Sequence, residues 1–231
     1  MSTSPPTTTT TNPPPKIHIT ITITPGTHSF TTDPLPPLLT LSLLSHHPSP
    51  ITLCTFNRPL ALPSALTNRS ITIHSLPSRQ KVETCSFRVN RPPVTRIKGD
   101  SDEQFYLTLL PNTPITISTP FGRGGGVNKI RPVPKAIAEK GWEVDEDGKE
   151  RRIRRSVQPT GVDGLEPGVE YEVGLDREGL EGMWWAPVGK EEILVEGGAE
   201  GEGRYVGDYG GWVKGGGVEW VVDGGRVKVM E

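Results

Sequence analysis

The chain has 231 residues, enough for one β domain with insertions, and its 27 Gly and 24 Pro exclude long helices as a main feature. Hydrophobic residues make up only 33%, which predicts a modest core with many turns. The formal net charge of −2 hides an asymmetry, because residues 1–100 carry 9 basic against 3 acidic side chains and residues 161–231 carry 6 against 16. We interpret this as complementary surface charge within one sandwich; the alternative is a basic face for an acidic partner.

No targeting or membrane segment is predicted. The N-terminal residues lack the apolar stretch of a secretion signal, and no window approaches the roughly eighteen apolar residues of a membrane-spanning helix. The two cysteines, Cys54 and Cys85, are therefore expected to be reduced thiols in the core. We expect no membrane contact and a cytoplasmic location, with a nuclear location as the alternative.

The N-terminal part of the chain begins with a tail and then the clearest strand. Residues 1–15 are mostly Thr, Pro and Ser, which predicts a disordered tail. Residues 16–24 then alternate strictly, with isoleucines on one face and polar residues on the other, and Pro25-Gly26 ends the strand. The isoleucines predicted to face the core are Ile17, Ile19, Ile21 and Ile23.

Short strands are expected to continue to residue 119, separated by turn residues, as is typical of an antiparallel sandwich. The segments at 38–45 and 51–56 are expected to form a hairpin across the turn at 46–50. Further strands are expected at 71–74, 82–90, 104–110 and 115–119.

Residues 122–160 interrupt this pattern, and we interpret them as an insertion. The segment opens with a glycine-rich loop at 122–126 and continues with a short helix at 134–140. A hairpin follows, with strands at 142–144 and 149–157 joined through Asp147-Gly148, a pair that suits a type I′ turn.

The best-specified segment is 164–175. Pro167-Gly168 predicts a type II turn, and the alternation after it predicts a strand buried on one face. The order Leu165-x-Pro167-Gly168-x-x-Tyr171 resembles the start of the sixth strand in fibronectin type III and related immunoglobulin-like sandwiches. The resemblance implies a structural corner made by Leu165, Pro167, Gly168 and Tyr171, in which the Tyr171 hydroxyl bonds to backbone.

The remainder of the chain is expected to complete the sandwich. Residues 190–195 predict its last strand, residues 197–217 are glycine-rich, and residues 218–229 predict a C-terminal hairpin packed on the sandwich or on the insertion.

Motifs of catalysis and metal binding are not recognised. His46-His47 is adjacent in a turn with no third ligand at a suitable spacing, and the sequence has no Gly-x-Ser-x-Gly elbow. The loop at 122–126 lacks the Gly-Lys-Ser/Thr ending of a phosphate-binding loop. We therefore predict no catalytic residue, no metal ligand and no cofactor.

Two residue sets are candidates for interaction. The basic run at 149–155 suggests a nuclear or nucleic-acid role, but the acids on the facing strand of the predicted hairpin favour cross-strand charge pairs instead. The tryptophans after residue 180 suggest an aromatic patch for a protein or a sugar ring, or packing beneath the insertion or the tail. Adjacent Trp184 and Trp185 must face opposite ways on a strand. The candidate residues are Trp184, Trp185, Trp212, Arg151, Arg152, Arg154 and Arg155.

A second resemblance rests on three segments: Leu-Cys-Thr-Phe-Asn-Arg-Pro-Leu at 53–60, Arg-Pro-Pro at 91–93 and Phe-Gly-Arg-Gly at 121–124. With the order of the strands, these residues resemble immunoglobulin-like domains of uncharacterised fungal proteins over about residues 16–196. They are also similar to the prodomains of deuterolysin-type secreted metallopeptidases. The resemblance implies no peptidase activity, because the chain has no His-Glu-x-x-His motif.

The combined prediction is an all-β protein with an antiparallel immunoglobulin-like sandwich at 16–196, an insertion at about 122–160, and a C-terminal hairpin within 197–231. We predict a non-enzymatic protein-interaction module with a protein partner. Two alternatives remain open: a carbohydrate-binding or hydrolytic protein that uses the tryptophan-rich acidic half, and nucleic-acid binding through residues 149–155, which we consider less favoured. The sequence does not predict the oligomeric state.

Overall fold

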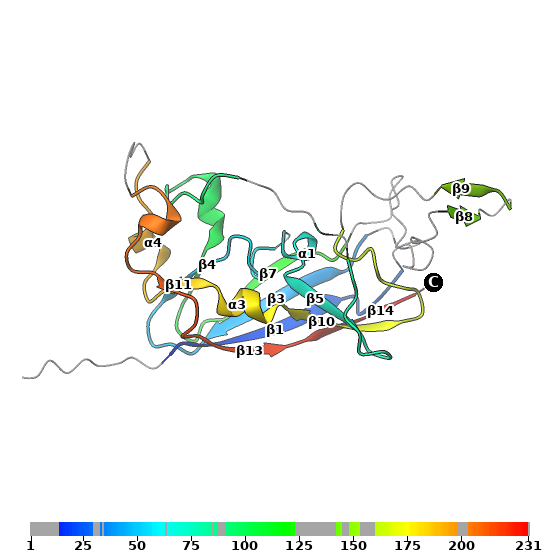
Figure 1. Ribbon diagram of the computed structural model, residues 1–231. Helices are drawn as coiled ribbons and strands as arrows, with labels where there is room; N and C mark the ends of the chain where they lie inside the picture. The colour runs from blue at the N-terminus through cyan, green and yellow to red at the C-terminus, as the bar shows by residue number, and fades with distance from the viewer. Residues whose placement is uncertain are drawn as a thin grey trace, which may run out of the picture.

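The computed structural model describes residues 14–29, 33, 35–62, 64–84, 86, 91–122, 142–144, 148–152, 160–197 and 203–230. Within these residues the chain is mostly β, as the sequence predicted. Twelve strands form three four-stranded sheets, and two further strands pair separately. In Figure 1 the long strands run side by side along the molecule, and β4, β11 and α4 lie at the end opposite the C-terminus.

Sheet A has the strand order β13-β1-β3-β7. Its central strands are β1 (Lys16–Thr24) and β3 (Leu38–Ser45), which are antiparallel, and its edges are β7 (Ile115–Pro120) and β13 (Glu219–Asp223). β13 runs parallel to β1, so the first strand of the chain and the second-to-last strand lie side by side in one sheet.

Sheet B has the order β2-β14-β10-β5. Its strands are β2 (Thr27–His28), β14 (Gly225–Val229), β10 (Glu170–Leu175) and β5 (Ile71–Ser75).

Sheet C has the order β12-β11-β4-β6. Its strands are β12 (Val213–Lys214), β11 (Trp184–Ala186), β4 (Ile51–Cys54) and β6 (Tyr106–Leu109). The helical elements that the structure describes are all short: α1 (Ser64–Thr67), η1 (Ser101–Phe105), α3 (Arg177–Glu181), α4 (Lys190–Ile193) and η2 (Val206–Asp208). None of them has the length and apolarity that crossing a membrane would require.

The main core lies between the inner faces of sheets A and B and includes Ile51, Leu53 and Leu109 of sheet C. The predicted strand at 16–24 is confirmed with the same bounds, and its four isoleucines are at most 7% exposed. They share one cluster with Leu39, Leu41 and Leu43 of β3 and with the inward residues of β10, such as Tyr171 and Val173. In β1, β3 and β10 alternation therefore fixes which face is buried, and burial of this apolar area is the main stabilising term.

The corner predicted around Tyr171 is present in the structure. Gly168 has a φ of 81°, which suits glycine at the second central position of a type II turn. The Tyr171 hydroxyl accepts a hydrogen bond from the Glu166 backbone N–H at 2.7 Å, and Leu165 is fully buried beside it. The turn is also tied to sheet B, because the Gly168 N–H donates to the carbonyl of Val229.

Tyr171→Phe is expected to lower the free energy of unfolding by about 1–2 kcal/mol, because the Glu166 N–H would lose its buried acceptor. Denaturant unfolding of both proteins measures this difference. An unchanged midpoint would show that Tyr171 contributes only through its ring.

The predicted hairpin of residues 38–56 is wrong, because β3 belongs to sheet A and β4 to sheet C. The segment 46–50 carries the chain from one sheet to the other, with His47 buried on the way. The return crossing between β6 and β7 lies beside it, where the Asn112 N–H donates to the carbonyl of Ser45. The pair β3–β7 in sheet A therefore continues into the pair β4–β6 in sheet C as one long two-stranded ribbon that bends between the sheets.

The predicted C-terminal hairpin is also wrong. β13 pairs with β1 in sheet A, whereas β14 pairs with β10 and β2 in sheet B. Only Gly224 separates β13 from β14, which is too short for a two-residue hairpin turn, so the strand bends and changes sheet instead. The bend needs small residues, since a Cβ on Gly225 would lie 3.0 Å from the carbonyl oxygen of Ile21.

Two further strand predictions need correction. Residues 190–193 form helix α4 rather than a strand, because Lys190, Glu191 and Glu192 are good helix formers and Ile193 alone needs burial. The strand expected at 82–90 is absent from residues 82–84, and Cys85 and residues 87–90 lie outside the described residues.

The predicted insertion is described only in part. Its hairpin is present as β8 (Trp142–Val144) and β9 (Glu150–Arg152), and Gly148 has a φ of 77° in the turn between them. Residues 123–141, with most of the glycine loop and the expected helix, lie outside the described residues. The same holds for residues 1–13 of the tail, while the Pro15 carbonyl accepts a hydrogen bond from the Glu219 N–H.

His28, at the end of β2, is buried against Asp33. Its Nδ1 lies 2.9 Å from Asp33 Oδ2, and the ring is only 2% exposed. Burial lowers the pKa of His28 below its ordinary value of 6.5, although the charge and hydrogen bond of Asp33 act in the opposite direction.

The stability of the fold is therefore expected to fall as the pH drops below 6.5, since the unfolded chain then binds a proton at His28 that the folded chain resists. Unfolding measured in steps from neutral pH to about pH 5, above the range where carboxylates titrate, tests this. His28→Asn should flatten the pH dependence; equal slopes for both proteins would contradict the assignment.

Candidate interaction surfaces

The tryptophans predicted to form a patch lie in and around sheet C. Trp184 and Trp185 are consecutive in β11, so their side chains lie on opposite faces of the sheet, as the sequence predicted. Trp185 packs against the main core and its Nε1 donates to the Gly216 carbonyl at 3.1 Å. Trp184 packs against a second core on the other face.

Trp212 lies at the centre of this second core and is 8% exposed. Its indole Nε1 donates to the Val206 carbonyl at 2.7 Å. Its ring stacks on Tyr106 at a centroid distance of 6.2 Å, and it also contacts the rings of Trp184 and Tyr209. The tryptophans are thus brought together, but around a buried ring rather than on an open platform.

Cations of the same chain lie over several of these aromatic rings. Lys214 Nζ is 4.6 Å from the centre of the Trp184 ring, and the Arg96 guanidinium is 5.5 Å from that of Tyr209. Because such contacts are favourable when the cation lies over the ring face, Trp184 and Tyr209 are already engaged within the protein.

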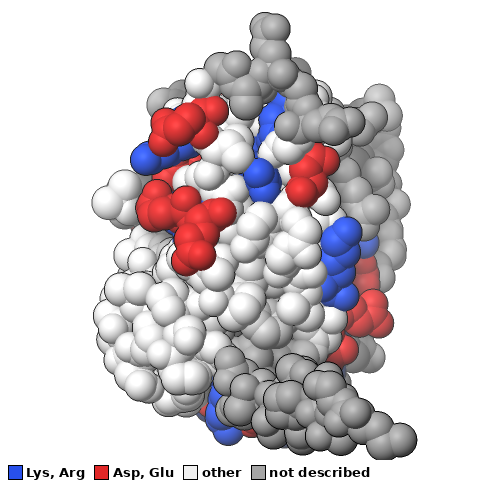
Figure 2. Space-filling view, turned by 90° about the vertical axis from the view of Figure 1, so that its left-hand side faces the viewer, with Lys and Arg blue, Asp and Glu red and all other residues white. Residues whose placement is uncertain are grey.

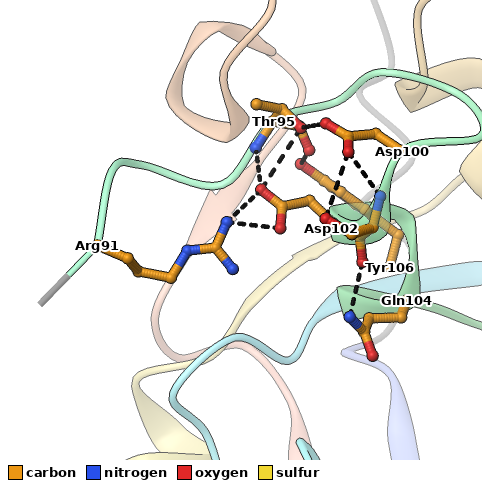
Figure 3. Close-up of polar contacts among 7 residues, drawn as sticks. Arg91, Thr95, Asp100, Asp102, Gln104 and Tyr106 are labelled. Atoms are coloured by element: carbon orange, nitrogen blue, oxygen red, sulfur yellow. Dashed lines mark hydrogen bonds and ion pairs between the residues drawn. The ribbon is translucent and has the colours of Figure 1, made fainter. Parts of the chain in front are cut away.

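A polar network beside the second core was not predicted from the sequence (Figure 3). Asp102, on η1, is 2% exposed and accepts from Arg91 Nη2 at 2.6 Å and from the Thr95 N–H at 2.9 Å. The Tyr106 hydroxyl donates to the Thr95 carbonyl at 2.9 Å. These bonds hold the loop at 91–100 onto η1 and β6.

Two carboxylates beside this loop, Asp100 and Glu103, have lowered pKa values. Hydrogen bonds from Thr95 and from the Ser101 backbone hold the pKa of Asp100 below its ordinary value. The hydrogen bond and charge of Lys190, with the Gly99 N–H, lower that of Glu103. Burial raises the pKa of the Tyr106 hydroxyl far above its usual range, so this group stays protonated. The network therefore fits a loop anchor.

The predicted arginine set is only partly described. Arg151 and Arg152 belong to β9, where the register places Glu143 opposite Arg151 and Trp142 opposite Arg152. Arg154 and Arg155 lie outside the described residues. The backbone pairing agrees with cross-strand charge pairs in the hairpin, and the nucleic-acid role stays a prediction.

The outer face of sheet B is charged. Glu170 lies opposite Lys228, and Glu172 lies between Arg226 and His74 on its two neighbouring strands. Both glutamates and both basic residues of β14 are exposed. Opposite charges at such cross-strand positions are a normal solvated surface.

The outer face of sheet A differs, because it is formed mainly by hydroxyl groups. Exposed Thr20, Thr22 and Thr24 alternate with the buried isoleucines of β1. The register places Thr40 and Ser42 of β3 beside them, and Ser118 and Thr116 of β7 follow. Thr40 and Ser118 are joined directly, with 3.0 Å between their hydroxyl oxygens.

We call the outer face of sheet A the hydroxyl face. Among its described residues, charged side chains lie only on the side next to β13 and at one end. Lys16 pairs with Glu219 at 2.7 Å, and His18 lies 2.6 Å from Asp223. Across the rest of β1, β3 and β7 the outer positions are Thr20, Thr22, Thr24, Leu38, Thr40, Ser42, Leu44, Thr116, Ser118 and Pro120.

Acidic side chains gather elsewhere on the molecule. Figure 2 views the end that lies on the left in Figure 1: Asp and Glu residues cluster in its upper part, at the height of α4, and much of the lower part carries no charged residue. Within the described residues, no group of three or more His, Cys, Asp and Glu is placed to hold a metal ion.

Comparison with known proteins finds neither a family model nor a curated relative that matches this chain.

Proposed function

We propose that the protein is a non-enzymatic interaction module that binds a protein partner on the hydroxyl face of sheet A. The observation that carries the proposal is the contrast between the two outer faces. Sheet B presents opposite charges at facing positions of neighbouring strands, as a solvated surface does, whereas the hydroxyl face has no charge across most of three strands.

The chemistry of the hydroxyl face favours a protein partner with a flat, uncharged surface. Depletion of charge is the compositional mark of the centre of a protein interface. A nucleic acid would need Lys and Arg to neutralise its phosphates, and this face has Lys16 only at its end. Threonine offers a methyl group for packing and a hydroxyl group for hydrogen bonds.

The alternatives keep weaker support. A sugar-binding patch needs free aromatic faces, but Trp212 is buried, Trp184 lies under Lys214, and Trp185 is only half-exposed. Nucleic-acid binding through Arg151, Arg152, Arg154 and Arg155 stays a prediction, as does the cytoplasmic or nuclear location.

We further propose that sheets A and B form an immunoglobulin-like sandwich to which sheet C is attached. Three features support this: the shared core between the two sheets, the strand crossings that join them, and the Tyr171 corner. Such sandwiches use sheet faces and loops to bind other proteins, which agrees with the proposed role.

A pair of matched substitutions tests the proposal. Thr22→Lys places one charge in the hydroxyl face, and Thr72→Lys places the same charge on the outer face of β5 in sheet B. Each variant and the native chain are immobilised and exposed to extract from the source cell, and each retained protein is quantified.

A protein that binds the hydroxyl face should be retained about tenfold less by Thr22→Lys than by the native chain, because binding would desolvate the ammonium group without giving it a partner. Thr72→Lys should retain the same amount as the native chain. Equal retention by all three chains, or selective loss with Thr72→Lys, would reject the proposal.

A further inference from the structure

The edges of the three sheets are protected in different ways, with one exception. An unprotected edge strand presents unpaired N–H and C=O groups that can pair with another chain. β2 and β12 have only two residues each, and β12 ends in Lys214. β5 is covered by residues 80–82, because the Val82 N–H donates to the Ile73 carbonyl and Ser75 N–H to that of Gln80. β6 has only four residues and α4 lies beside it, where the Lys190 N–H donates to the Thr108 side-chain hydroxyl.

β13, at one edge of sheet A, is protected by charge. Glu219 and Asp223 lie on its outer face, one at each end of the strand. Two copies of β13 paired antiparallel around Val221 would place Glu219 opposite Asp223, and like charges in directly opposite positions are unfavourable.

β7, at the other edge of sheet A, has none of these protections. It is six residues long, it contains no charged residue, and among the described residues it pairs only with β3. Its residues up to Thr119 are mostly β-branched, and Ile115 and Ile117 are half-buried at the margin of the core. Pro120, which cannot donate to a ladder, occupies the last position only.

The sequence of β7 is complementary to itself. In an antiparallel pair centred on Ile117, Thr116 meets Ser118 of the second copy on the outer face. On the inner face, Ile117 meets Ile117 and Ile115 meets Thr119. Hydroxyl groups then face hydroxyl groups on the outer face. On the inner face Ile117 packs on Ile117, and Ile115 lies against Thr119, so the strand is self-complementary as a two-fold interface requires.

We propose that two copies of this chain associate through β7, joining their A sheets into one continuous eight-stranded sheet. The second copy pairs its own β7 antiparallel to the first, so the backbone groups at the open edge of residues 115–118 gain partners, and the buried Thr119 ends the paired segment. This pairing uses only the edge of sheet A and needs no partner protein on the hydroxyl face. The dimer would nevertheless extend the hydroxyl face across both copies.

Two double variants test the pairing and its register. Thr116 and Ser118 are exposed, so lysine at both positions leaves the core of each copy unchanged. Thr116→Lys with Ser118→Lys would place lysine opposite lysine twice in the dimer, and should raise the dissociation constant by about tenfold. Thr116→Lys with Ser118→Glu would place lysine opposite glutamate twice and should keep the dimer.

Sedimentation equilibrium of the full chain over a concentration series measures the dissociation constant of the native chain and of both variants. The inference predicts a native dimer, its weakening in the Lys/Lys variant and its recovery in the Lys/Glu variant. If the native chain is a monomer at every concentration, the proposed dimer is wrong. That result is expected if residues 123–141 or another protein, rather than a second copy, pair with this edge. Equal constants for the two variants would also overturn the proposed dimer, because the interface would then lie elsewhere.

Discussion

Trp212→Ala is expected to lower the free energy of unfolding by about 3–5 kcal/mol, because it removes a buried indole and leaves a cavity. Trp212 is 8% exposed and contacts the rings of Tyr106, Trp184 and Tyr209. Its loss also leaves the Val206 carbonyl without the indole donor. Chemical denaturation monitored by circular dichroism measures the change.

Trp184→Ala is the matched control, because Trp184 belongs to the same aromatic cluster but is only half-buried. Its cost should be clearly smaller than that of Trp212→Ala. Equal costs, or a negligible cost for Trp212→Ala, would mean that Trp212 does not organise the second core and would restore the case for an aromatic binding patch.

Asp102→Ala is expected to destabilise the protein by about 3 kcal/mol, because removal of one member of a buried ion pair leaves its partners unsatisfied. Arg91 would lose both carboxylate contacts and the Thr95 N–H would lose its acceptor. The Arg91 side chain is 32% exposed, so water can solvate part of its charge and moderate the loss. Thermal and denaturant unfolding of the variant give the value.

Gln104→Ala serves as the control for Asp102→Ala. Gln104 lies in the same 3₁₀ helix but is exposed, and its side chain reaches only the Ser101 carbonyl. This change should alter stability by about 0.5 kcal/mol or less. If both variants cost the same small amount, the network around Asp102 would not be the anchor of the 91–100 loop.

The sequence predicted best those features that depend on near neighbours. The alternation of residues 16–24 gave the bounds of β1 and its buried face, and the Leu165–Tyr171 motif gave a turn and a hydroxyl contact that the structure contains. Both depend on interactions within a few residues, so a local pattern suffices to predict them.

The predictions that were wrong are mainly those of which sheet a strand joins. The pattern of β13 and β14 is that of two strands with a Gly-Gly link, and nothing local distinguishes a hairpin turn from a bend between sheets. The parallel pairing of β13 with β1 joins residues about two hundred positions apart, and no local pattern encodes it. Helix α4 was mistaken for a strand because a four-residue segment is too short to show its period.

For the candidate surfaces, too, features that depend on near neighbours were predictable and features that depend on distant contacts were not. Strand geometry alone predicts that Trp184 and Trp185 face opposite ways. The burial of Trp212 instead depends on three other rings, and two of them, Tyr106 and Trp184, are distant in the sequence. The alternating threonines of β1 were visible in the sequence, but their continuation onto Thr40, Ser42 and Ser118 required the register of sheet A. The Arg91–Asp102 pair likewise joins a loop to a helix by tertiary contact.

Site-specific photocrosslinking in the source cell tests the role of the hydroxyl face most directly. A photoreactive residue is placed at Thr22 on sheet A or at Glu172 on the charged outer face of sheet B, and adducts are identified by mass. We expect position 22 to crosslink to one other protein and position 172 to give no adduct. An adduct at position 172 with none at position 22 would contradict it.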